Sequence, residues 1–116
     1  MASSAPPANT TAVNSAVQEI LPSPTTLVHA ARLALKNDKP LLFDYYVDSA
    51  TKKAFMGLDK ETNDKMLVKS AEEYTSQIVK TYKVAEDFIV ETENSIYIVS
   101  GKIEMRKIQS QSFKLE

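Results

Sequence analysis

The chain has 116 residues, and its 14 Lys and Arg against 15 Asp and Glu give a net charge of −1 at neutral pH. This length allows one modest domain, and the near-zero charge argues against a protein that reads nucleic acid through a strongly basic surface. With no Cys and a single His, His29, the composition excludes disulfides, thiolate nucleophiles and thiolate metal sites. No apolar run approaches the length of a membrane span, so we expect a soluble intracellular protein.

Residues 1–23 are predicted to form an extended arm. Residues 1–18 carry no charge and are mostly Ala, Ser, Thr, Pro, Asn and Val, a composition too poor in apolar surface to order by itself. The side chains that share one side of a short helix over 12–21 are Val13, Val17, Ile20 and Leu21. So short a helix is marginal in water, so we expect these four side chains to bind a partner protein. A frayed tail is the alternative.

A helix is predicted over 24–36, directly after the arm. Ser23 is a favourable N-cap residue, and Pro24 supplies a preset φ at the first helical position. Asn37 is expected to end the helix before Pro40. The side expected to face the core consists of Leu27, Val28, Ala31, Ala34 and Leu35. The opposite, solvated side consists of His29, Arg32 and Lys36.

After Pro40 the apolar period changes from 3.6 to 2, which predicts short strands joined by polar turns. The predicted strands cover 41–47, 53–58, 65–69, 77–84, 88–92, 96–99 and 103–108. The first two are expected to form a hairpin. Lysines flank 65–69 as they do in strands near a sheet edge, and 70–73 has the spacing of a helical turn. Both faces of 96–99 are apolar, which indicates a central strand with the helix on one side.

These elements predict an α+β fold. One N-terminal helix is expected to pack on an antiparallel meander or small open barrel of about six or seven strands, because short links favour antiparallel neighbours. The compact domain is expected to cover 24–110, between the extended arm and a C-terminal tail over 111–116.

The sequence contains no catalytic, metal-binding or nucleotide-binding motif, so we predict neither an enzyme nor a bound cofactor or metal. The acidic turn at 59–64 lacks the Gly and Glu that a calcium loop uses. Asp44 interrupts the predicted strand over 41–47, and a pocket around Asp44 and Tyr46 is where an enzyme would have its site. A solvent-exposed Asp44 is the simpler interpretation.

Binding of single-stranded nucleic acid is the alternative function. Aromatic side chains on strands between lysines can stack bases in small β-barrel domains, and the closest match here is the set Lys80, Tyr82 and Lys83. A domain of this size needs many of its aromatic rings for its core, and its net charge offers little attraction to phosphates. Nucleic acid is therefore the less favoured partner.

Three stretches together carry a family resemblance: 38–46 (DKPLLFDYY), 67–76 (LVKSAEEYTS) and 93–100 (ENSIYIVS). They resemble small uncharacterised proteins of nucleocytoplasmic large DNA viruses that infect algae and protists. The resemblance implies a virus-encoded protein, made in the host cytoplasm as a minor component of the particle, and assigns no functional residue. We therefore expect a structural or interaction protein of a virion, whose arm tethers neighbouring capsid subunits.

Overall fold

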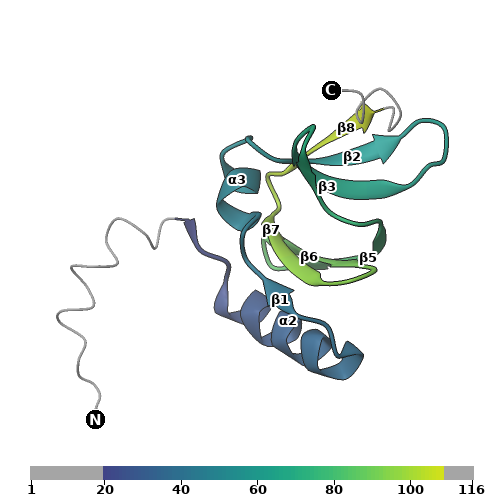
Figure 1. The fold of residues 1–116 in the computed structure, drawn as a ribbon. Coiled ribbons are helices and arrows are strands. Elements are labelled where there is room, and N and C mark those ends of the chain that lie inside the picture. Colours follow the sequence, from purple (N-terminus) through teal and green to yellow (C-terminus); the bar gives the residue numbers. More distant parts are fainter. Residues whose placement is uncertain (1–19, 109–116) are drawn as a thin grey trace, which may run out of the picture.

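The computed structural model describes residues 20–108. These residues form an α+β fold with one main helix, as predicted (Figure 1). The elements are, in chain order, α2 (Pro24–Asn37), β1 (Leu41–Leu42), α3 (Tyr46–Ala50), β2 (Phe55–Asp59), β3 (Lys65–Ser70), β4 (Glu73–Tyr74), β5 (Ile78–Val84), β6 (Asp87–Thr92), β7 (Ile96–Ser100) and β8 (Glu104–Ile108). No helix within 20–108 is long and apolar enough to cross a membrane.

The strands form two four-stranded mixed sheets, which corrects the prediction of a single antiparallel meander or open barrel. The first sheet has the order β1-β7-β6-β5, in which β1 runs parallel to β7 and the other pairs are antiparallel. The second has the order β4-β3-β2-β8, in which β2 runs parallel to β8. Each parallel pair joins strands that are distant in sequence, and turn residues between neighbouring strands do not encode such pairs.

The core lies on both sides of the first sheet. α2 covers one face of this sheet, and the second sheet lies over the other face (Figure 1). On the central strand β7, Ile96 and Ile98 pack towards α2, whereas Tyr97 and Val99 pack towards the second sheet. Ile98 is fully buried. The prediction that 96–99 is a central strand with the helix on one face is confirmed.

Local capping residues set the ends of α2. The N-terminal cap is the predicted one, whereas the C-cap is Asp38, one residue after the predicted Asn37. The Ser23 hydroxyl oxygen accepts a hydrogen bond from the backbone N–H of Thr26 at 3.0 Å, and Pro24 is the first helical residue. At the other end Asp38 adopts the left-handed conformation with φ of 55°. That conformation reverses the chain, and the Lys39 N–H then donates to the Ala34 carbonyl at 3.1 Å.

The buried side of α2 differs from the predicted one. Thr26 and Ala30 are fully buried, and Leu33 and Ala34 are half-buried. Of the apolar set expected to face the core, only Ala34 does so; the exposed members are Leu27, Val28, Ala31 and Leu35. Both sets repeat at helical spacing, so the pattern alone could not choose between them. Thr26 and Ala30 are small enough for α2 to approach the sheet, and the Thr26 hydroxyl lies 3.2 Å from the Val84 carbonyl.

Residues 41–47 do not form the predicted strand. Only Leu41 and Leu42 pair with β7, and the chain then turns into the short helix α3. The successive residues Tyr45 and Tyr46 are both buried, which a strand with one exposed face does not allow. The alternation of apolar and polar residues was therefore misleading here, because tertiary packing buries both tyrosines. The predicted hairpin of 41–47 with 53–58 is wrong as well, since β2 pairs with β3 and β8.

The remaining strands agree with the predicted ranges to within about two residues. β3 lies beside the outermost strand β4, so it is near a sheet edge, as its flanking lysines predict. The segment after β3 differs from the prediction. In place of a helical turn at 70–73, the chain turns at 71–72 and continues as β4. The local sequence is compatible with a helical turn and with a turn between two strands. Pairing of β4 with β3 selects the turn between strands.

A half-buried ion pair fastens the end of α2 to the first sheet. The Lys39 ammonium lies 2.8 Å from the Glu91 carboxylate and donates to the Thr92 carbonyl at 2.8 Å. The Asn37 side-chain amide donates to the same Glu91 oxygen at 3.0 Å. Glu91 is buried, so these two donors compensate the loss of its hydration.

Candidate functional site

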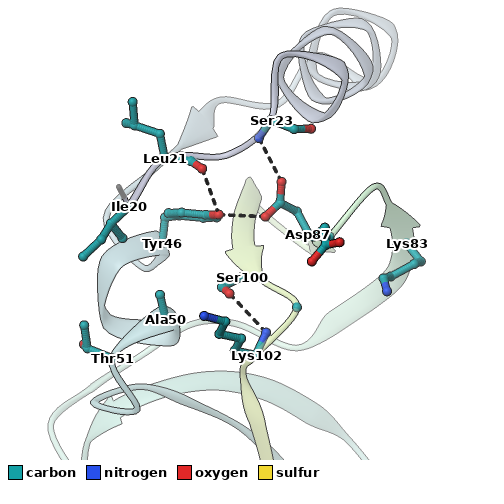
Figure 2. Close-up of a pocket in the computed structure, with 12 residues that line it drawn as sticks. Ile20, Leu21, Ser23, Tyr46, Ala50, Thr51, Lys83, Asp87, Ser100 and Lys102 are labelled. Carbon is teal, nitrogen blue, oxygen red and sulfur yellow. Dashed lines mark hydrogen bonds between the residues drawn. The ribbon is translucent and has the colours of Figure 1, made fainter. Parts of the chain in front are cut away.

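A polar pocket of about 560 Å³ lies where the chain enters the described domain (Figure 2). We call it the junction pocket. Its walls come from the segment before α2, from α3, from the turn between β5 and β6, and from the turn after β7. Lys83 and Lys102 contribute cations to the lining, and Glu86 and Asp87 contribute carboxylates.

Asp87 holds three elements together in this pocket. One carboxylate oxygen accepts the Ser23 backbone N–H at 3.0 Å and the Thr26 hydroxyl at 2.8 Å. The other accepts the Tyr46 hydroxyl at 2.7 Å (Figure 2). Asp87 is only 3% exposed, and hydrogen bonds to a buried carboxylate are stronger than neutral ones. The bonds join the start of α2, helix α3 and strand β6.

Tyr46 extends this network to the base of the arm. Its hydroxyl lies 3.2 Å from the Leu21 carbonyl as well as 2.7 Å from Asp87. Burial, together with the hydrogen bond to Asp87, raises the pKa of the Tyr46 hydroxyl above its ordinary value. The phenol therefore stays protonated at neutral pH and acts as a hydrogen-bond donor. The chemistry of the junction pocket is that of a structural connection between the entering chain and the core.

A second depression of about 230 Å³ lies between α2 and the first sheet. We call it the basic groove. Its apolar part consists of Leu33, Tyr82, Val84 and Ile89. Its polar part consists of His29, Arg32 and Lys36, all of which are exposed. The residues that line it include no carboxylate.

The outward side of α2 is a third surface feature. Leu27, Val28, Ala31 and Leu35 repeat at intervals of three and four residues and so lie on one side of the helix. We call this set the outer stripe. Leu35 is 84% exposed and Val28 is 50% exposed. Single exposed apolar residues are ordinary, but a contiguous apolar set is typical of an interaction surface.

Of the four arm residues predicted to bind a partner, the described part of the chain includes Ile20 and Leu21. Val13 and Val17 lie outside the described residues, as do the other residues of 1–19 and the tail over 111–116. Ile20 is half-buried and packs against the cluster between α2 and the first sheet. Leu21 is 54% exposed beside it, and both line the junction pocket.

The predicted nucleic-acid set is divided between the two faces of β5. Tyr82 is half-buried and packs towards α2 at the basic groove. Strand alternation places Lys80 on the same face. Lys83 lies on the opposite face, where its ammonium is 5.3 Å from the centre of the Phe88 ring.

The residues considered for catalysis do not come together. Asp44 is exposed in the turn before α3, whereas Tyr46 is buried and bonded to Asp87. His29 is exposed on α2 at the basic groove. Among residues 20–108, no three His, Asp or Glu side chains gather as a metal site would require.

Sequence reasoning did not identify Asp87. In the sequence it follows Ala85 and Glu86 in a short polar link, and Asp is common in such turns. Its donors are Ser23, Thr26 and Tyr46, which are 41 to 64 positions away. No local signal connects these residues.

Comparison with known proteins gives no relative. No family model matches the chain, and no significant match was found among curated proteins or solved structures.

Proposed function

We propose that this protein is a structural component of a larger assembly, which binds neighbouring protein subunits through its N-terminal arm and the outer stripe of α2. The single observation that carries the proposal is the outer stripe: a helix packed on its own sheet still presents a second apolar side, with Leu35 84% exposed. Covering such a side with a partner removes apolar surface from water.

The base of the arm supports the same role. Ile20 packs against the core, the Leu21 carbonyl lies 3.2 Å from the Tyr46 hydroxyl, and the Ser23 N–H donates to buried Asp87. An arm that binds a neighbour through Val13 and Val17 would thus be attached to the domain through a core contact and a buried carboxylate. The assembly that the sequence resemblance implies is the particle of a large DNA virus, with this chain as a minor capsid component.

The test of the arm is deletion of residues 1–19. Deletion of 1–22 is unsuitable, because it also removes the core contact of Ile20 and the Leu21 carbonyl. Tagged full-length and shortened proteins are produced in cells that form the particles, and their amounts in purified particles are measured. We expect the deletion to lower incorporation about tenfold, as a loss of about 1.4 kcal/mol of binding free energy would do. Incorporation of the shortened protein at the full-length level refutes the tether.

The outer stripe is tested by Val28→Glu together with Leu35→Glu. The matched control is Val47→Glu together with Met105→Glu, which places the same charges on apolar residues that are 49% and 56% exposed elsewhere. We expect the stripe variant to be lost from particles and the control to be retained. Equal incorporation of both variants rejects the stripe as an interface, and absence of the full-length protein from particles rejects the virion role.

A further inference from the structure

We infer that the basic groove binds an acidic peptide in an extended conformation, which pairs with the outer edge of β5. This surface is separate from the arm and from the outer stripe, so the inference goes beyond the proposed function. Three independent features meet here: an open strand edge, an apolar depression beside it, and an excess of positive charge.

The strand edge is the first feature. β5 is the outermost strand of the first sheet, and within the described residues it pairs only with β6. An antiparallel strand directs the N–H and C=O groups of every second residue away from its partner. β5 is seven residues long, which is enough for several main-chain hydrogen bonds to an added strand.

The apolar depression is the second feature. Along β5, Tyr82 and Val84 pack towards α2, and they line the depression together with Leu33 of the helix and Ile89 of β6. A peptide strand added to β5 would direct alternate side chains to this side of the sheet. The volume of about 230 Å³ suits one or two aliphatic side chains. The groove therefore selects an apolar residue at one of the peptide positions that face α2.

The charge is the third feature. α2 and β5 together contain four Lys and Arg and no Asp or Glu, although the whole chain has more acidic than basic residues. Arg32 and Lys36 line the groove with His29, and Lys80 lies on the same face of β5. Because these cations lie on the same side of the sheet as the apolar depression, we expect the acidic residues of the peptide at its other α2-facing positions, two residues before and after the apolar one.

The two lysines of β5, Lys80 and Lys83, argue against a second copy of this chain as the partner bound at this edge. Pairing β5 with β5 would bring Lys80 and Lys83 of both copies close together, and like charges on paired strands repel. The groove also differs from a nucleic-acid surface. Among its lining residues Tyr82 is the sole Phe, Tyr or Trp, and its ring is half-buried against the core, which restricts stacking of bases.

The experiment uses the full chain and a fluorescent peptide whose α2-facing positions carry one Val or Leu between two Glu residues, with Thr at the intervening positions. Binding is followed by fluorescence anisotropy. Three other probes are measured in parallel: the same peptide with Lys in place of Glu, the acidic peptide with alternate backbone nitrogens methylated, and a single-stranded oligo-dT. We expect the unmodified acidic peptide alone to bind, because methylation removes the donors that pair with β5. Its affinity should fall as salt rises.

The variant Arg32→Glu with Lys36→Glu is expected to weaken binding at least about tenfold. The control is Lys53→Glu with Lys60→Glu, two exposed lysines outside the groove, which should bind as the original protein does. All four positions are exposed, so circular dichroism should show both variants folded. Failure of the acidic peptide to bind at about 1 mM, equal binding of the methylated peptide, or equal binding by the Arg32 and Lys36 variant overturns the inference. Preferred binding of oligo-dT overturns it in favour of nucleic acid.

Discussion

Replacement of Asp87 by Asn should destabilise the fold strongly, although it alters a single atom. The carboxylate accepts three hydrogen bonds, from the Ser23 N–H, the Thr26 hydroxyl and the Tyr46 hydroxyl. In Asn one acceptor oxygen becomes an NH2 group, so at least one buried donor faces another donor. The bonds that survive lose the assistance of the negative charge.

The magnitude follows from these contacts. A buried donor left without an acceptor costs about 1 to 3 kcal/mol, and a hydrogen bond to a charged group contributes about 1.5 to 3 kcal/mol. Relief of the buried charge offsets part of the loss. We therefore expect the Asp87→Asn change to lower the free energy of unfolding by about 2 to 4 kcal/mol, a large share of the roughly 5 to 15 kcal/mol of a typical domain.

The assay is urea unfolding followed by far-ultraviolet circular dichroism, with Glu86→Gln as the matched control. Glu86 is the exposed neighbour of Asp87 and lines the same pocket, so its change should stay within about 0.5 kcal/mol. A double-mutant cycle with Tyr46→Phe should give a coupling of about 1 kcal/mol or more. An Asp87→Asn protein within about 0.5 kcal/mol of the original, with an unchanged urea slope, refutes the reasoning.

Three further predictions concern stability. The pKa values of Tyr45 and Tyr46 are raised, chiefly by burial. Above about pH 10 the unfolded chain therefore binds fewer protons than the folded chain, so the free energy of unfolding falls as pH rises. The fall should reach about 3 kcal/mol near pH 11, and a flat urea midpoint from about pH 9 to 11 contradicts it. Lys39→Met leaves buried Glu91 with one hydrogen-bond donor fewer. Urea unfolding should show that the free energy of unfolding falls by about 2 to 4 kcal/mol. A fall below about 0.5 kcal/mol would show that the ion pair does not stabilise the fold. Ile98→Ala empties a fully buried site and should lower the free energy of unfolding by about 2 to 5 kcal/mol by the same assay, whereas a smaller loss would mean that the core collapses around the change.

The amino-acid sequence by itself determined those elements whose signals are local. Ser23 and Pro24 begin α2 because the cap bonds and the preset φ lie within one turn of chain. The strands from β5 to β8 follow from a period of two and from polar links between them. The all-apolar run at 96–99 likewise identified the central strand, since a strand covered on both faces has no polar side.

Tertiary structure alone decided the choices between locally equivalent alternatives. α2 has two apolar sides, and the sheet selected the one with small Thr26 and Ala30, which allow close approach and a hydrogen bond to Asp87. Residues 46–50 form a helix because the successive residues Tyr45 and Tyr46 are both buried, which a strand with one exposed face does not allow. The junction pocket and the two parallel strand pairs join residues about 40 or more positions apart. Such pairings depend on the free energy of the whole packed core, which no short stretch of sequence contains.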